Sequence, residues 1–446
     1  MTSSYPPPPM PEWRTVHPRP FLDFAEHPGA LKYPNLPSKP RAERFYGPFA
    51  VSTHIIPAAY PRMVPQIPLP QIPKFSPNAQ ERKQNINRLA EEIQVRQHMF
   101  GQGKLPGQPS EAMLWNCVNR YFRTDYPPLE EHTGITLFLA HANGFPKEIW
   151  ETTLRFLLSH PSASHIEEIW SWEAVQHGDS ALLNANSLSG IYDWMDNSRD
   201  IANFLIKYLP EVPLDGSLST HLPRLPRHVS EDRKKSGYSR RILVDVGHSM
   251  GGCTSVEVAI NFPALFSSMI LIDPVIVQPH SYARGYLRGM VIGALQRRTR
   301  WSSREEALQL FKASPFFAAW HPDVLQLYVD YGLTEDSEGG VRLKMSGLHE
   351  ALVFANDRTS AEVWELLEKL DEDIELKWIL PGKPESKGIQ GEAASKIRVW
   401  RRPANSSNVV IHSAGHLITQ ESPEELAQQI SDFLEHKYRN RIKSML

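Results

Sequence analysis

One short stretch of the sequence combines the residue types needed for nucleophilic catalysis. An apolar run at residues 242–246 leads directly into G-H-S-M-G at residues 247–251, and helix-like sequence follows. A strand, a sharp turn and a helix around the pattern G-x-S-x-G are typical of a nucleophile elbow, which exposes a serine hydroxyl above a sheet. The two glycines leave room for so tight a turn. The pattern therefore predicts that Ser249 is a nucleophile.

A serine hydroxyl needs a base to take its proton at neutral pH. The sequence offers His416, which follows an apolar strand at residues 408–411 and precedes a helix start at residues 422–425. A loop after this late strand lies at the same edge of a parallel sheet as Ser249. His412 is the alternative base, but it lies within or at the end of the strand, where we expect packing. We therefore predict that His416 is the general base.

Two carboxylates have the right chain order to orient this histidine and stabilise its protonated form. Asp273 ends the apolar strand at residues 268–272, and Glu385 follows the next predicted strand in a polar, glycine-containing turn. Glu385 has the more usual strand position for such an acid, whereas Asp273 lies on a better-anchored strand with a shorter reach. We predict that Asp273 is the acid and keep Glu385 as the alternative.

Acyl transfer also requires N–H groups that face the developing oxyanion. Met250, next to the serine, supplies one backbone N–H. The second is expected from the loop H-A-N-G-F-P at residues 141–146, which follows a buried strand at residues 135–140. The small, turn-prone residues of this loop let its amides point inward. Asn143 is the predicted second donor, and Gly144 is the alternative.

We expect no catalytic role for the other polar residues predicted at the sheet edge that carries Ser249. Residues 173–180, E-A-V-Q-H-G-D-S, form a further predicted loop, in which His177 and Asp179 are expected to brace their neighbours. No paired His or Cys spacing typical of metal ligands stands out. We therefore expect a site that uses neither a metal nor a cofactor.

The elements that must position these residues alternate along the chain. Strand-like runs occur at residues 45–56, 112–121, 135–140, 165–171, 242–246, 268–272, 375–380 and 408–411. Helical spacing occurs at residues 78–100, 148–160 and 192–209 and in the final segment towards Tyr438. Strands that alternate with helices predict an α/β fold with a mostly parallel sheet covered on both faces. We expect its core to comprise residues 44–277 and 371–446.

Three segments depart from this alternation. Half of the 38 prolines lie in the first 80 residues, so residues 1–43 are expected to be extended or mostly disordered. Residues 211–240 are polar and basic, which predicts a surface loop. Residues 278–370 look helical and lie between two late strands, so they would cover the strand ends where ligands bind in such folds. We predict a helical cap or lid there.

Composition excludes several classes of protein. The 48 basic and 50 acidic residues nearly balance, which favours no nucleic-acid partner. The two cysteines, Cys117 and Cys253, imply no disulfide framework. The longest apolar stretch, residues 269–277, is too short to span a bilayer and contains Asp273 and Pro274. The first residues also lack a secretory signal pattern, so a soluble intracellular protein is expected.

The last three residues suggest a location. Ser444, Met445 and Leu446 follow the basic residues Arg441 and Lys443. Peroxisomal import uses a small residue, then usually a basic one, then leucine, and methionine in the middle departs from the S-K-L form. We expect recognition by a peroxisomal import receptor, with the cytoplasm as the alternative location.

The assembled motifs resemble the α/β-hydrolase superfamily across most of residues 110–435. The matching segments are A-H-A-N-G-F, H-G-D-S-A, G-H-S-M-G-G, L-I-D-P, and A-G-H-L followed by E-S-P-E-E. More narrowly, A-H-A-N-G-F-P-K-E, F-F-A-A-W-H-P-D-V-L-Q-L-Y-V-D-Y-G-L and the carboxyl-terminal tripeptide resemble fungal peroxisomal serine hydrolases of the yeast peroxisomal lipase and AK-toxin biosynthesis type. This resemblance implies an eight-stranded sheet, a helical cap and a Ser-His-acid triad.

These observations predict a serine hydrolase that cleaves a small-molecule carboxylic ester through an acyl-enzyme. The resemblance implies a place in peroxisomal lipid or secondary-metabolite metabolism, including toxin biosynthesis. An acyl thioesterase and a non-catalytic ligand-binding protein on the same fold remain alternatives. Apolar cap residues indicate a hydrophobic acyl pocket, although most of them are expected to form the core of the cap: Phe311, Phe316, Phe317, Trp320, Leu325 and Tyr328.

Overall fold

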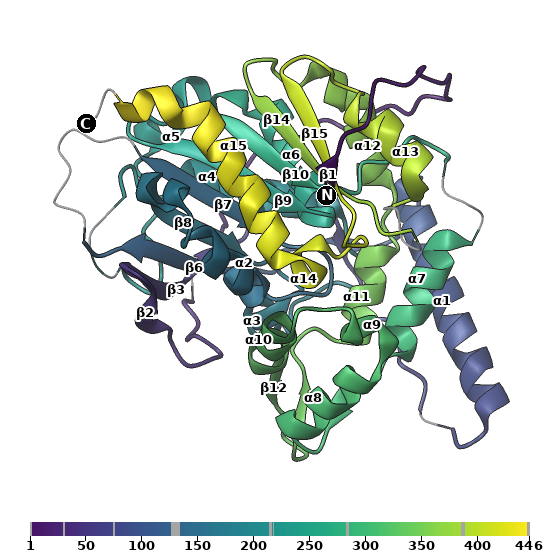
Figure 1. Cartoon of the computed structure of the whole chain (residues 1–446). Coiled ribbons are helices and arrows are strands. Elements are labelled where there is room, and N and C mark those ends of the chain that lie inside the picture. Colours follow the sequence, from purple (N-terminus) through teal and green to yellow (C-terminus); the bar gives the residue numbers. More distant parts are fainter. Residues whose placement is uncertain are drawn as a thin grey trace.

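The computed structural model describes residues 2–29, 32–74, 76–125, 134–213, 216, 218–281, 285–384 and 389–443. Within them, ten strands form one central sheet (Figure 1). From edge to edge they are β1 (Thr2–Ser3), β15 (Ser406–Ile411), β14 (Glu375–Pro381), β10 (Ser268–Ile272), β9 (Ile242–His248), β7 (Ile135–Ala140), β8 (Ile166–Trp172), β6 (Trp115–Arg123), β3 (Phe49–Pro57) and β2 (Ala42–Tyr46). The run from β15 to β8 is parallel throughout, so the sheet is mostly parallel, as expected.

The sheet has ten strands, whereas we expected eight. The eight from β15 to β3 correspond to the strand-like runs of the sequence, and the two additional strands lie at the edges. The run expected at residues 45–56 is divided at Gly47, whose φ of 55° turns the chain back and pairs β2 with β3. β1 is only two residues long, too short to leave a pattern in the sequence, and it pairs with β15.

Each face of the sheet carries its own hydrophobic core because neighbouring strand residues point to opposite sides. In β7, Leu137 and Leu139 belong to one core, and Phe138 and Ala140 belong to the other. Helices α2 (Glu151–Leu157) and α15 (Pro423–Lys443) cover the first face. Helices α4 (Trp194–Lys207), α6 (Met250–Asn261) and α12 (Arg358–Leu366) cover the second.

The insertion between β10 and β14, called the cap below, is mainly helical. Most of it lies below the sheet in the view of Figure 1. Its helices, besides α12, are α7 (Tyr286–Gln296), α8 (Arg304–Ala313), α9 (Pro315–Ala318), α10 (Pro322–Gly332) and α11 (Gly347–Phe354). It also contains a three-stranded sheet that the sequence did not predict, formed by β11 (Arg300–Trp301), β13 (Val341–Leu343) and β12 (Leu333–Glu335). Strands this short show no alternation, and we expected residues 278–370 to be helical.

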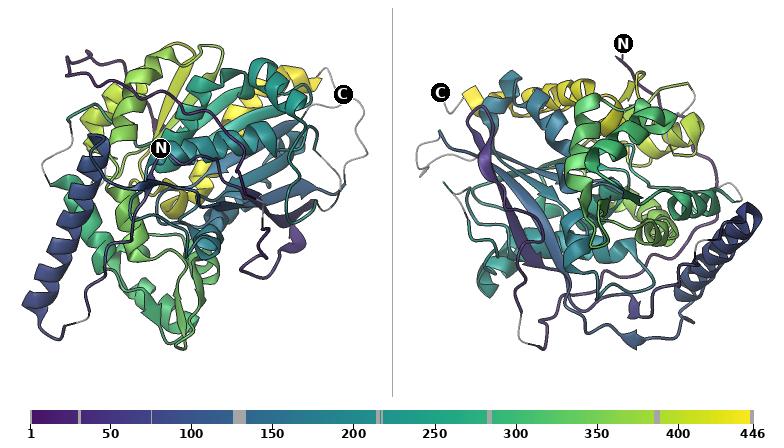
Figure 2. Two further views of the ribbon diagram at one scale, coloured as in Figure 1. Left: turned by 180° about the vertical axis from the view of Figure 1, so that it is seen from behind. Right: turned by 90° about the horizontal axis from the view of Figure 1, so that it is seen from below.

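We expected the proline-rich amino-terminal segment to be extended or mostly disordered. Its described residues are extended, as proline requires, but they pack on the body of the molecule. Tyr5 is 8% exposed, and the Trp13 ring meets Trp364 edge-on with centroids 5.9 Å apart. Figure 2 traces this segment, in purple, across the surface. Residues 2–29 are called the strap below. A few large side chains hold it, and composition alone does not reveal them.

The remaining elements lie around this core. The long helix α1 (Ala79–Gly101) begins at Asn78, whose side chain accepts hydrogen bonds from the first-turn amides, and it lies beside α7. The segment 211–240, expected to be a surface loop, instead contains the helix α5 (Arg227–Ser236). The other elements are β4 (Pro65–Gln66), β5 (Gln108–Pro109), α3 (Gly178–Leu183), α13 (Gly391–Val399) and α14 (Ile418–Glu421).

Candidate active site

Ser249 lies at the sharp turn between β9 and α6. Its backbone has φ 57° and ψ −117°, a combination that non-glycine residues rarely adopt. A Cβ on Gly247 would lie 2.5 Å from Gly252 Cα, and one on Gly251 would lie 2.3 Å from the Ala140 carbonyl oxygen. Both flanking positions therefore require glycine. The turn has the geometry of the nucleophile elbow that the sequence pattern predicts.

The structure brings Ser249, His416 and Asp273 together. Ser249 Oγ donates to His416 Nε2 at 3.0 Å, and His416 Nδ1 donates to Asp273 Oδ2 at 2.6 Å. His416 lies on the loop between β15 and α14, and Asp273 directly follows β10. The ends of β9, β10 and β15 thus supply the three side chains, with β14 between the last two strands. The arrangement has the contacts through which a hydroxyl can be deprotonated and the resulting imidazolium stabilised.

Asp273 is fully buried and firmly held. Its backbone N–H donates to the Ile379 carbonyl at 2.9 Å, and its Oδ2 also accepts the Ile389 N–H at 3.2 Å. Its Oδ1 pairs with the guanidinium of Arg398 from α13. Burial by itself raises the pKa of Asp273, but Arg398 and His416 outweigh it and hold that pKa below its ordinary value. The carboxylate is therefore ionised at neutral pH.

A second histidine fixes the backbone of the His416 loop. His248 Nε2 donates to the His416 carbonyl at 2.9 Å, and Thr419 Oγ1 donates to His248 Nδ1 at 3.3 Å. Burial and the nearby His416 ring lower the pKa of His248 to about 3, so its ring stays neutral. Sequence reasoning missed His248 and Arg398. His248 occupies a variable position of the G-x-S-x-G pattern, and Arg398 lies in a helix without any motif.

The two alternative residues have different outcomes. His412 directly follows β15 and is exposed, and its Nε2 meets Ser3 Oγ at 2.9 Å, whereas Ser249 contacts His416. It is therefore not placed to act as the base. Glu385 lies outside the described residues, as do Ser444, Met445 and Leu446.

The predicted oxyanion donors line the same cavity as Ser249. Met250 begins α6, and the first N–H groups of a helix lack intrahelical acceptors. The side chain of Asn143 is held at both ends: His177 Nε2 donates to its Oδ1 at 3.0 Å, and its Nδ2 donates to the Glu350 carbonyl of the cap at 3.3 Å. Gly144 has a φ of 93° and lies against the Glu350 carboxylate.

A buried charge cluster supports this loop from behind. Lys147 is fully buried, and its ammonium group donates to Asp179 Oδ2 at 2.9 Å and to Glu173 at 3.4 Å. Lys344 of the cap segment also pairs with Asp179, at 2.6 Å. His177 and Asp179, expected to brace loops, thus join the 141–146 loop to its neighbours. The motifs A-H-A-N-G-F-P-K-E and H-G-D-S therefore contact each other through these side chains.

A cavity of about 530 Å³ opens over Ser249 and His416 and is called the acyl cavity below. Most of its wall is apolar and comes from the cap and the adjoining loops: Ala142, Phe145, Trp194, Val275, Tyr286, Leu287, Met290, Pro315, Phe316, Ala319, Phe354, Ile389 and Leu417. Of the six cap residues named from the sequence, Phe316 lines this cavity and is 57% exposed. The other five pack within the cap, as expected for most of them. Sequence patterns gave no signal for Trp194 or Met290.

The described ranges contain no group of three or more His, Cys, Asp or Glu residues arranged to hold a metal ion. They also contain no helix with the length and apolar character needed to cross a bilayer.

Several known proteins resemble this chain. One relative is a type I acyl-CoA thioesterase of Penicillium brevicompactum, 26% identical over 271 residues that cover 55% of this chain and 56% of that protein. Another is Lpx1, a peroxisomal membrane protein of Saccharomyces cerevisiae, 26% identical over 247 residues that cover 51% of this chain and 58% of that protein. The chain thus spans a little over half the length of these two curated relatives.

An abhydrolase domain-containing protein of Alternaria alternata is 26% identical over 223 residues, which cover 43% of this chain and 83% of that protein. The resemblance inferred from the motifs is therefore confirmed.

Structural comparison agrees with the sequence. A crystal structure of Lpx1, described as a peroxisomal alpha-beta-hydrolase, aligns with a TM-score of 0.59 at 19% identity, covering 86% of this chain and 89% of that chain. The model of the alpha/beta hydrolase family matches residues 137–429, well over half of the sequence. That span includes the serine turn, the buried carboxylate and the histidine loop. The chain belongs to the alpha/beta hydrolase family.

Proposed function

We propose that this chain is a serine hydrolase that cleaves a carboxylic ester through an acyl-enzyme. In this mechanism Ser249 Oγ attacks the ester carbonyl while His416 Nε2 takes the hydroxyl proton. Asp273 holds the imidazole tautomer and stabilises the imidazolium. His416 then gives the proton to the leaving oxygen as the C–O bond breaks, and water hydrolyses the acyl-serine by the same route. The observation that supports this most directly is the continuous contact from Ser249 through His416 to Asp273.

The backbone N–H groups of Met250 and Asn143 are the proposed oxyanion donors. Two features support this assignment. Both residues line the acyl cavity beside Ser249, and the Asn143 side chain is already engaged with His177 and Glu350, which leaves the orientation of its loop fixed. Fixed donors lower the barrier because they need no reorganisation when charge develops.

The acyl cavity supports a substrate with an apolar acyl group. Its volume of about 530 Å³ lies within the usual range for small-molecule sites, and its wall is predominantly apolar. Burial of hydrocarbon there contributes roughly 25 cal/mol per Å² of apolar surface removed from water. The leaving group, on the other side of the scissile bond, does not need to be apolar.

A thioester is the second candidate substrate. One of the relatives is a type I acyl-CoA thioesterase, and the same three side chains serve thioesters and oxygen esters equally well. The two substrates differ only in the leaving group, which is a thiol in one case and an alcohol in the other. Residence in peroxisomes is proposed as well, supported by the name of the yeast relative. A fluorescent fusion with and without Ser444–Leu446 tests that location.

Labelling with a fluorophosphonate probe tests the proposed mechanism. The wild-type protein should be labelled and should hydrolyse p-nitrophenyl esters, and Ser249→Ala should abolish both signals. Ser255→Ala is a matched control because Ser255 is also buried in the helix that follows the elbow. Undiminished labelling in Ser249→Ala, or no labelling of the folded wild-type protein, contradicts the proposal.

A further inference from the structure

A second cavity, of about 760 Å³, lies next to the acyl cavity and is called the strap cavity below. Three separate parts of the chain form its wall. The strap contributes residues 14–17, and the end of α1 contributes residues from 94 to 102. The cap with its neighbouring segments contributes residues 277, 278, 280 and 287 and residues from 355 to 362. It has no part in the mechanism described above.

The two cavities share a wall. Leu287 lines both of them. Along the segment that ends α11 and begins α12, Phe354 and Asn356 line the acyl cavity, whereas Ala355 and Asp357 line the strap cavity. The acyl cavity and the strap cavity are therefore adjacent, with this segment between them.

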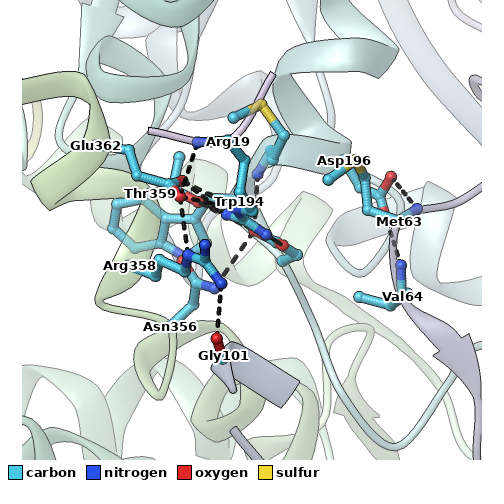
Figure 3. A network of polar contacts seen from close by, with 12 residues as sticks. Arg19, Met63, Val64, Gly101, Trp194, Asp196, Asn356, Arg358, Thr359 and Glu362 are labelled. Carbon is cyan, nitrogen blue, oxygen red and sulfur yellow. Dashed lines mark hydrogen bonds and ion pairs between the residues drawn. The ribbon is translucent and has the colours of Figure 1, made fainter. Parts of the chain in front are cut away.

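The strap cavity is more polar than the acyl cavity, and its wall carries basic side chains. Arg14 is exposed at its wall and makes no hydrogen bond or ion pair with the residues that the structure describes. Arg358 donates Nε to Glu362 at 2.8 Å and Nη1 to the Gly101 carbonyl at 2.8 Å, which leaves Nη2 for a ligand (Figure 3). Three histidines also line it: His17, His98 and His280.

Two carboxylates also line the strap cavity, and neither forms an ion pair with Arg14. Glu362 is already neutralised, because Arg19 binds it at 2.8 Å in addition to Arg358 (Figure 3). Asp357 is the other carboxylate in the lining. Arg14 thus supplies a positive charge that no described residue pairs, and Arg358 Nη2 adds a hydrogen-bond donor; a guanidinium is well matched to phosphate.

Contacts with buried residues anchor the part of the strap that lines the cavity. Arg19 pairs with Asp193 and Glu362, both almost fully buried, and Trp13 packs on Trp364. These anchors flank residues 14–17 on both sides. The position of Arg14 is therefore set by contacts on either side of it along the chain.

We propose that the strap cavity binds the phosphate-bearing part of a thiol leaving group while the acyl chain occupies the acyl cavity. The inference rests on the proposed function and specifies its substrate as an acyl thioester of a phosphorylated thiol such as coenzyme A. Ser249 Oγ forms the acyl ester as the C–S bond breaks, and the thiolate takes the proton held by His416. Water then releases the carboxylic acid and restores Ser249.

Three substrates with one acyl chain test this proposal on the full-length protein: decanoyl-coenzyme A, decanoyl-pantetheine, which lacks the phosphates, and p-nitrophenyl decanoate. Wild-type KM should be lower for the coenzyme A thioester than for the pantetheine thioester. Arg14→Glu should raise KM for decanoyl-coenzyme A by about tenfold or more, since a charge-assisted contact is lost and a repulsive one gained. It should leave both other substrates within about twofold.

Arg227→Glu is the matched control, because Arg227 is an exposed arginine on α5 outside both cavities. Inhibition by 3′,5′-ADP or by 4′-phosphopantetheine tells which phosphate is bound, and either result supports the proposal. Equal effects of Arg14→Glu on all three substrates overturn it, as does an unchanged KM for decanoyl-coenzyme A. Hydrolysis of the p-nitrophenyl ester without any thioester hydrolysis also overturns it, yet leaves the serine mechanism intact.

Discussion

The strand-end edge that carries Ser249 and the strap cavity beside it are built in different ways. At the edge, backbone geometry fixes each position: Ser249 has a φ of 57°, and Asp273 has a φ of 33°. At the strap cavity, side chains from three distant segments meet, with Arg14 near one end of the chain and Arg358 far along it. Chemistry that needs sub-ångström placement thus lies on rigid elements, whereas recognition of a larger ligand is assembled from additions to the fold.

The largest expected effect comes from the edge. Asp273→Asn removes the negative charge that stabilises the His416 imidazolium and fixes its tautomer, so kcat should fall about 10⁴-fold. Steady-state kinetics with a p-nitrophenyl ester measures the change. Asp245→Asn is the matched control, because this buried carboxyl lies on β9 and burial raises its pKa to about 8, which keeps it protonated at neutral pH. A small fall in kcat for Asp273→Asn would instead favour Glu385 as the acid.

The next effect concerns the strap. Arg19→Met leaves Asp193 and Glu362, which are 0% and 1% exposed, without their shared cation, so the free energy of unfolding should fall by about 3 kcal/mol. Urea denaturation measures this loss. Arg224→Met removes an exposed pair with Glu26 and should cost less than about 1 kcal/mol. Equal stability of the two variants would mean that the strap is not anchored by this pair.

Sequence patterns predict the strand-end edge that carries Ser249 far better than they predict the strap and its contacts. The strands at residues 135–140 and 268–272 are predicted to the residue because a strand buried on both faces is a continuous apolar run. Ser249, His416 and Asp273 follow from their places after such strands. Nothing local marks Arg19 as a partner of Asp193, or Arg398 as a partner of Asp273, since the partners lie more than a hundred residues apart. Long-range ion pairs leave no periodic signal.

A moderate effect is expected where the edge depends on one of these hidden partners. Among the groups that lower the pKa of Asp273, Arg398 ranks first, and together with His416 it outweighs burial. Arg398→Gln should therefore raise that pKa. Activity requires the ionised carboxylate, so the acid limb of kcat/KM should move to higher pH, with a loss of about tenfold near pH 5 and a smaller loss at pH 8.

Stability should change in the same sense. A carboxylate whose folded-state pKa is depressed adds stability above its unfolded pKa of about 4, and that stability is lost as pH falls through the folded value. Arg398→Gln shrinks this contribution, so the variant should unfold at a higher pH during acid titration. Arg398→Lys keeps the charge and should restore most of the pH profile. An unshifted acid limb in Arg398→Gln would show that Arg398 contributes to the fold and not to the ionisation of Asp273.

The smallest expected effect distinguishes chain lengths within the acyl cavity. Met290 on α7 lines that cavity and not the strap cavity. Met290→Trp fills part of the volume available to the acyl group, so kcat/KM for a dodecanoyl ester should fall several-fold more than for a butanoyl ester. Leu310→Trp adds similar bulk at a residue 42% exposed on α8, outside the cavity lining, and should leave the ratio unchanged. Each methylene that fits contributes only about 0.8 kcal/mol on burial. In a graded series of esters, kcat/KM of the variant should therefore fall behind that of the wild type from the chain length at which its smaller cavity is full. A uniform loss across the series would mean that the acyl chain lies elsewhere in the cap.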